Sequence, residues 1–179
     1  MTVPVSPDAA PDKLTLRQLG NTPRAAALLQ RVVEAAPRFA QLLSGASPGP
    51  HEGEEILSLL PEGKTADEKF VYAVELEGVC IGCVDLIRDY PDTSTAHIGL
   101  LLLAQAYEGC GLGSASLARI EALVRTWPEC SRLRVGIVER NARALAFWTR
   151  HGFVPTGESK PYGVDPIGSR VLIYAKPLA

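Results

Sequence analysis

Hydrophobic positions along the chain follow two periods. Alternating apolar and polar residues, or short apolar runs, are typical of β-strands, whereas apolar residues three or four positions apart are typical of amphipathic helices. The pattern predicts strands over residues 13–19, 69–76, 79–87, 95–103, 132–138, 153–158 and 170–176. It predicts helices over residues 22–36, 38–43, 51–60, 115–124 and 141–151.

The connections between these elements predict the direction of the strands. Glu77-Gly78 is a tight turn between the second and third strands, which predicts an antiparallel hairpin, and residues 89–94 form a further turn. The strands from residue 95 to residue 158 are joined through helices, and helical crossovers favour parallel pairing, whereas a Gly/Pro-bearing loop joins the last two strands. We therefore expect an α/β protein whose sheet has mixed strand directions.

Length and composition narrow the class of protein. The chain has 179 residues, of which 46% are hydrophobic and 21% charged, as in a globular protein of one domain. A net charge of −2 does not favour nucleic acid or an anionic membrane surface as a partner, and no apolar stretch is long enough to span a bilayer. We expect residues 1–12 to be a flexible tail, residues 13–179 to form a single domain, and the location to be cytoplasmic.

Two of the four cysteines, Cys80 and Cys83, have the CxxC spacing. They lie inside a predicted strand, where residues three apart point to opposite faces, and no second pair of ligands follows. We therefore expect buried free thiols rather than a redox pair or a zinc site.

The most informative segment is Glu108-Gly109-Cys110-Gly111-Leu112-Gly113-Ser114, which lies between a predicted strand and a predicted helix. Such a loop turns several backbone N–H groups toward one point at the positive end of a helix, and this arrangement attracts phosphate. A Walker loop is excluded, because no lysine follows the last glycine. A dinucleotide-binding loop is disfavoured, because the spacing is GxGxG and the loop comes late in the chain.

The same segment resembles the GCN5-related N-acetyltransferase (GNAT) family, whose signature is Arg/Gln-x-x-Gly-x-Gly/Ala after the fourth strand. The stretch from Asn141 to Phe153 resembles the family's second motif, Asn-x-x-Ala-x-x-Phe-Tyr-x-x-x-Gly-Phe, and one helix and one strand separate the two motifs. The resemblance implies an α+β arrangement with a mixed, mostly antiparallel central sheet of about seven strands flanked by helices.

It also implies acetyl-CoA as co-substrate and no metal. Backbone N–H groups of residues 109–114 would bind the pyrophosphate, and the edge of the fourth strand would pair with the pantetheine amides once the fourth and fifth strands splay apart. The expected cofactor-binding residues are Leu101, Leu102, Leu103, Glu108, Gly109, Cys110, Gly111, Leu112, Gly113, Ser114, Asn141 and Trp148.

Two residues depart from the family pattern. Glu108 stands where the family has Arg or Gln, and Trp148 stands where many members have a tyrosine that protonates the departing thiolate. An indole cannot act as an acid near neutral pH, so Tyr162, Tyr107, Cys110 or water would take that role. His97 is the candidate for removing a proton from the attacking amine, whereas Asp85 and Asp89 would bind a cationic substrate or relay protons. The expected catalytic residues are therefore His97, Tyr162 and Asp85.

We thus expect an N-acetyltransferase that transfers acetyl directly to a primary amine of a small molecule or peptide. A CoA-binding sensor without turnover and an enzyme that prefers a longer acyl group are the alternatives. The acids Asp85, Asp89 and Asp92 would favour a cationic amine, and a homodimer is compatible with a fold of this type.

Overall fold

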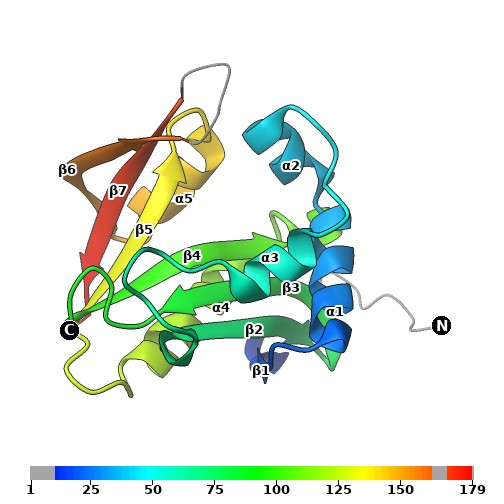
Figure 1. The fold of residues 1–179 in the computed structure, drawn as a ribbon, viewed down its shortest axis with the longest axis horizontal. Helices are drawn as coiled ribbons and strands as arrows, with labels where there is room; N and C mark the ends of the chain where they lie inside the picture. The colour runs from blue at the N-terminus through cyan, green and yellow to red at the C-terminus, as the bar shows by residue number, and fades with distance from the viewer. Residues whose placement is uncertain (1–10, 163–168, 179) are drawn as a thin grey trace.

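A computed structural model of the chain describes residues 11–162 and 169–178, and in this part seven strands form one sheet (Figure 1). The sheet order is β1-β2-β3-β4-β5-β7-β6, and every neighbouring pair is antiparallel except β4 and β5, which are parallel. The strands are β1 (Leu14–Leu19), β2 (Lys69–Leu76), β3 (Val79–Ile87), β4 (Thr95–Leu103), β5 (Arg132–Val138), β6 (Val154–Pro161) and β7 (Arg170–Pro177). The mixed, mostly antiparallel sheet expected from the sequence is confirmed.

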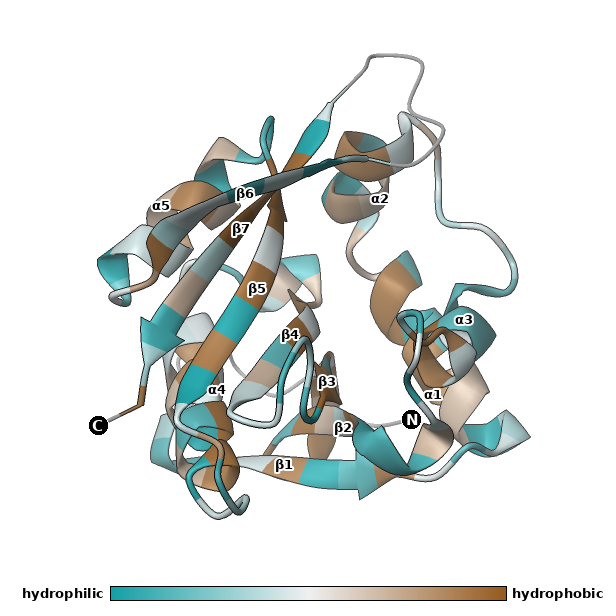
Figure 2. Ribbon diagram, turned by 60° about the vertical axis from the view of Figure 1, so that its left-hand side comes forward, coloured by the Kyte–Doolittle hydropathy of each residue, from teal (hydrophilic) through white to brown (hydrophobic). Residues whose placement is uncertain are grey.

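Within residues 11–162 and 169–178, five α-helices cover the two faces of the sheet. They are α1 (Pro23–Glu34), α2 (Pro37–Ser44), α3 (Glu52–Ser58), α4 (Leu112–Val124) and α5 (Ala142–Arg150). Side chains of α1 and α3 pack on one face with residues such as Val71 and Cys83, whereas α4 and α5 pack on the other with residues such as Leu86 and Ile137. Figure 2 shows the hydrophobic residues of these helices and strands in brown. We call the side covered by α1 and α3 the front face, as it faces the viewer in Figure 1.

The pairing of β4 with β5 is short. Hydrogen-bonded register runs only from Thr95 opposite Arg132 to Ile98 opposite Val135. Beyond these positions β4 keeps β3 as a neighbour and β5 keeps β7, so the two strands diverge (Figures 1 and 2). The expected splay is therefore present, and on β5 it begins after Val135.

Two β-bulges change which residues share a face. Gly99 is an extra residue in β4, since Asp85 pairs with Leu100 and Leu86 with Ile98. Ile81 is an extra residue in β3 in the same way. This second bulge makes one expectation wrong, that Cys80 and Cys83 point to opposite faces, because both pack on the front face. Both are free thiols, as expected, with Cys83 buried and Cys80 half-buried.

Some element boundaries differ from the expected ones. Helix α4 begins at Leu112 rather than residue 115, so half of the glycine loop belongs to the helix, and β6 continues to Pro161 rather than residue 158. Three short 3-10 helices, at Pro11–Lys13, Ala66–Glu68 and Gln105–Tyr107, were not expected. Of the expected tail, residues 1–10 lie outside the described residues, and the carbonyl of Asp12 accepts a hydrogen bond from Arg119.

The front layer depends on close contact between α1 and α3. Gly53 of α3 is buried, and a Cβ atom added there would lie 2.1 Å from the carbonyl oxygen of Ala26. The amide of Gln30 fastens the same contact, because it accepts from Gly53 N–H at 3.1 Å and donates to Gly49 C=O at 2.8 Å. A side chain at residue 53 would therefore push the two helices apart.

We predict that Gly53→Ala lowers the free energy of unfolding by about 1–3 kcal/mol, the usual cost of overpacking, although alanine favours helix more than glycine does. Urea unfolding followed by circular dichroism measures this. Glu55→Ala, at an exposed position of the same helix, is the control. A Gly53→Ala variant as stable as the control would show that the helices separate without cost.

Candidate active site

The glycine loop has the geometry of an anion site. Gly109 and Gly111 have φ values of 81° and 79°, a left-handed backbone that glycine adopts readily. The first helical bond of α4 runs from Ala115 N–H to Gly111 C=O, and no side chain caps this end of the helix among the described residues. The N–H groups of residues 112–114 therefore point out of the positive end of a 13-residue helix.

The negative charge of Glu108 is neutralised within the structure. Its carboxylate forms an ion pair with the guanidinium of Arg143, the second residue of α5. The side chain of Arg143 is 63% exposed, so the cation faces solvent next to the loop. Arg143 thus cancels the negative charge that Glu108 places beside the loop.

Helix α5 also fixes the rest of the loop. Ser114 Oγ lies 2.9 Å from His151 Nε2, and a Cβ at Gly113 would lie 3.4 Å from the ring of Phe147. Burial is the main reason that the pKa of His151 is lowered, which favours a neutral ring near pH 7. The second motif thus supports the first through direct contacts.

Strand β4 presents free backbone groups where it leaves β5. Ala104 N–H donates to Ile81 C=O of β3, and because successive N–H groups of a strand alternate in direction, those of Leu101 and Leu103 point to the unpaired edge. Leu102 contributes its side chain to the core of the front face. The backbone N–H groups of Leu101 and Leu103 are therefore available as hydrogen-bond donors to a ligand that pairs with this edge.

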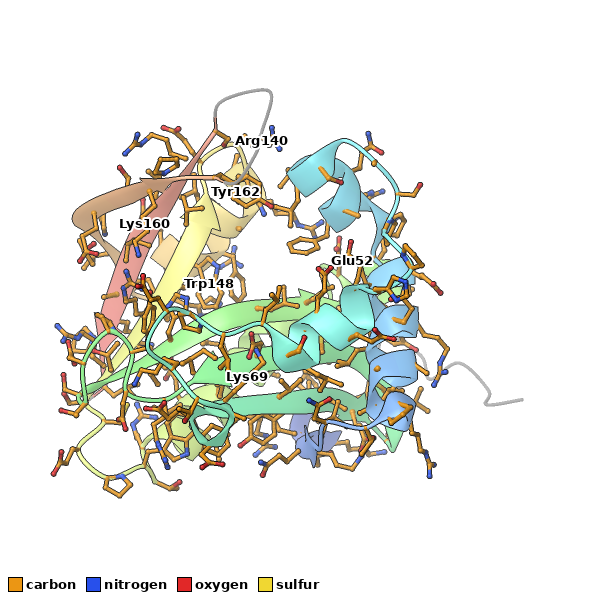
Figure 3. All side chains as sticks on the ribbon, viewed as in Figure 1. Glu52, Lys69, Arg140, Trp148, Lys160 and Tyr162 are labelled. Atoms are coloured by element: carbon orange, nitrogen blue, oxygen red, sulfur yellow. The ribbon has the colours of Figure 1, made fainter. Side chains whose placement is uncertain are left out.

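The two other residues expected to bind CoA belong to α5. Asn141 caps this helix, since its Oδ1 accepts from Ala144 N–H at 3.0 Å. Trp148 is only 6% exposed and packs edge-on against Phe153, at a centroid distance of 4.8 Å. Figure 3 shows it behind the divergence of β4 and β5, where a contact with the CoA arm would involve only its small exposed fraction. The expected roles of both residues in CoA binding stay predictions.

Asp85 belongs to β3 and lies opposite the bulge in β4. One carboxylate oxygen, Oδ1, bonds Lys69 Nζ at 2.8 Å, and the other, Oδ2, lies 2.7 Å from the position that a Cβ of Gly99 would occupy. The Lys69 side chain is 4% exposed and that of Asp85 is 15% exposed. Burial raises the pKa of Asp85, and Lys69 opposes that rise. A side chain at residue 99 would displace this carboxylate.

His97 lies on the same face, beside Arg134 of β5. Arg134 Nη1 is 3.5 Å from His97 Nδ1, and the guanidinium of Arg134 also lies 5.5 Å from the centre of the Tyr90 ring. Burial, followed by the charges of Arg134 and Lys160, lowers the pKa of His97 to about 3. A neutral imidazole of such low pKa is a weak base, so the role expected for His97 stays a prediction with less chemical support.

Tyr162 follows the last residue of β6 and is half-buried, and its N–H donates to Ser169 C=O at 3.0 Å. In Figure 3 Tyr162 lies at the same end of the molecule as Arg140. Arg140 follows β5, and its guanidinium donates a hydrogen bond to Leu43 C=O. The structure thus brings together Asp85, Gly99 and His97 on the front face, whereas Tyr162 belongs to a different part of the fold. Its role as the acid stays a prediction.

Three charged residues of the site were missed from the sequence. Lys69, Arg134 and Arg143 each pair with a carboxylate 16, 24 or 35 positions away. Arg143 lies inside the second motif, and Arg134 interrupts an apolar strand, a signal that could have been used.

Comparisons with known proteins agree with this fold. A 25% identical acetyltransferase from Thermus thermophilus superimposes with a TM-score of 0.72, over 93% of this chain and 97% of that one. A GNAT acetyltransferase from Elizabethkingia anophelis with acetyl-CoA bound has 15% identity and a TM-score of 0.61, over 93% and 99%. A chimera based on a spermidine N-acetyltransferase from Vibrio cholerae has 17% identity and a TM-score of 0.68, over 93% and 96%. A search of curated sequences found no significant match.

The fold and the loop together define the class of acyl-CoA N-acyltransferases. The model of the Acetyltransferase (GNAT) family matches residues 36–153, so the chain belongs to the GNAT acetyltransferase family. Among the described residues, no helix has the length and hydrophobicity needed to cross a bilayer.

We predict that Arg143→Gln weakens CoA binding about 2- to 5-fold, since it removes a cation beside the diphosphate and leaves Glu108 unneutralised. The double variant Glu108→Gln/Arg143→Gln should regain part of the loss. Isothermal titration calorimetry measures both, with Arg119→Gln of α4 as the control, because the guanidinium of Arg119 bonds the Asp12 carbonyl rather than Glu108. Equal CoA affinity in Arg143→Gln and the native protein would contradict a role for this ion pair.

We also predict a pH effect on stability from His97. Its pKa of about 3 in the folded chain is below the ordinary value of 6.5, so between these pH values the unfolded chain binds a proton that the folded chain does not. The free energy of unfolding should therefore fall as the pH drops from 6.5 toward 3, by about 2–4 kcal/mol after allowance for partial exposure. His97→Gln should flatten this fall in urea titrations at several pH values, and superimposable pH profiles would count against it.

Proposed function

We propose that this protein is an acetyl-CoA-dependent N-acetyltransferase that transfers the acetyl group directly to a primary amine. The observation that carries this proposal is the uncapped N-terminus of α4 behind Gly109 and Gly111, at the end of a strand whose edge is unpaired. The loop would bind the diphosphate, and Leu101 and Leu103 would bind the pantetheine amides by strand addition. One of these N–H groups would polarise the thioester carbonyl.

Asp85 is the residue that we propose to accept the proton of the attacking amine. It belongs to β3, opposite the bulge in β4, and its Oδ2 reaches the front face of β4 at Gly99, the residue that follows the last pairing of β4 with β5. Its pKa is raised by burial, which brings it closer to the operating pH than that of an ordinary carboxyl, whereas the pKa of His97 is moved away from it. The proton released by the amine ends on the CoA sulfur, so the transfer consumes no net proton.

The direct test is the release of free CoA thiol from acetyl-CoA in the presence of a panel of primary amines. We expect turnover with at least one amine and saturable CoA binding by calorimetry. Tight CoA binding without turnover would favour a sensor. A faster reaction with longer acyl-CoA thioesters would show that the enzyme transfers a longer acyl group than acetyl.

We predict that Asp85→Asn lowers kcat roughly 100-fold and leaves CoA affinity unchanged, because a general base is lost. The double variant Asp85→Asn/Lys69→Met also removes the buried lysine, which would be unpaired in Asp85→Asn. A low kcat in the double variant therefore reports the loss of the base rather than a loss of folding. In Lys69→Met the acid limb of the pH–rate profile should move to higher pH, since Lys69 lowers the pKa of Asp85. Asp89→Asn is the control, and a larger loss in His97→Gln than in Asp85→Asn would transfer the role to His97.

A further inference from the structure

The acidic residues that would favour a cationic acceptor are all paired with cations. Asp85 bonds Lys69, Asp89 lies 3.7 Å from Arg88, and Asp92 bonds Arg132 at 3.0 Å. Asp92 also accepts hydrogen bonds from Ser94 and Thr95. These carboxylates are held by partners of their own, so they do not present a free negative charge to a substrate.

The charge beside His97 is positive instead. Leu133 and Val135 pack in the cluster with α4, so Arg134 between them points to the front face, the face of Asp85 and His97. Arg134 is paired with His97 across β4 and β5, and Gly99 at the bulge lies two residues further along β4. Both charges that act on His97, those of Arg134 and Lys160, are cationic. Lys160 is labelled on β6 in Figure 3.

Arg134 is an unusual residue to bury. Its side chain is 7% exposed, and its carboxylate partner is Glu158 at 3.3 Å, a side chain that is 59% exposed. Glu158 lies where the pairing of β6 with β7 is interrupted between Pro155 and Ser159, so an edge strand supplies it. A buried guanidinium needs an anionic partner. Here that partner is the solvent-exposed carboxylate of Glu158, which the carboxylate of a bound molecule can replace.

We propose that Arg134 binds an anionic group of the acceptor, and that the acceptor is therefore an amino acid or a similar amine with a carboxylate a few bonds from its nitrogen. This inference rests on the proposed acetyl transfer and adds its substrate class. In the free protein Glu158 occupies the position of the substrate carboxylate. When the acceptor binds, its carboxylate replaces Glu158 at Arg134, and its amine lies toward Asp85 and the bulge.

The test compares amines that differ in the carboxylate alone. Each standard amino acid is assayed for thiol release beside its amide and its decarboxylated amine. For at least one amino acid, kcat/KM should exceed that of both analogues about 10-fold or more, as expected for loss of a charge-assisted hydrogen bond. A preference for the amide or the decarboxylated amine across the panel overturns the proposal and leaves the acetyl transfer standing.

A second readout does not depend on turnover. The N-acetyl amino acid should bind the CoA-loaded protein in calorimetry, and its amide should bind at least about 10-fold more weakly. If CoA binds and no carboxylate compound does, the substrate class is wrong. If CoA itself does not bind, the proposed function fails. Calorimetry of the N-acetyl amino acid with the CoA-free protein then still decides whether Arg134 binds a carboxylate.

Variants assign the effect to this residue. Arg134→Gln should abolish the preference for the carboxylate, mainly through KM, and Arg134→Lys should retain part of it. Glu158→Gln should lower KM for the amino acid, because the competing side-chain carboxylate is gone, a result that a purely structural ion pair does not produce. Arg132→Gln, on the same strand, should leave the preference unchanged. If Arg134→Gln does not fold, Arg134→Lys and Glu158→Gln decide the outcome, and an unchanged or raised KM in Glu158→Gln overturns the proposal.

Discussion

The early end of hydrogen bonding between β4 and β5 shapes the whole candidate site. The strands share register from Thr95 to Ile98 on β4, and then each continues with its other neighbour alone. Backbone groups on the open edge of β4 are left for another partner, in the middle of a sheet where they would otherwise be paired. The glycine loop follows β4 after the short 3-10 helix at Gln105–Tyr107, and α5 follows β5, so both motifs of the family lie around this divergence.

Charge is distributed around the divergence in a consistent way. Arg143 pairs with Glu108 beside the glycine loop and faces solvent, whereas Arg134 is a buried cation on the front face. On the same front face as Arg134, Asp85 is a carboxylate held by a buried lysine. A buried ion pair contributes little to stability compared with apolar packing of the same volume, so the pair of Lys69 and Asp85 is not explained by stability alone. The two cations suit the diphosphate of CoA and, as we propose, an anionic acceptor.

Several elements were predictable because their signals are local. Glu77 and Gly78 both adopt positive φ, at 51° and 80°, as the tight hairpin turn requires. Strand β5 matches its predicted range in full. The errors fell where tertiary contacts override the local pattern. The bulge at Ile81 reversed the expected facing of Cys80, and the start of α4 inside the glycine loop depends on Gly111 as its N-cap.

The amino-acid sequence by itself determined the order of the α-helices and strands, the position of the glycine loop and the family, because each depends on residues a few positions apart. Only the tertiary structure decided which charges meet. Lys69 and Asp85, Arg134 and Glu158, and Arg143 and Glu108 are 16, 24 and 35 positions apart. Their contacts follow from strand register, from the bulge at Gly99 and from the packing of α5 on the loop, and no local pattern encodes these.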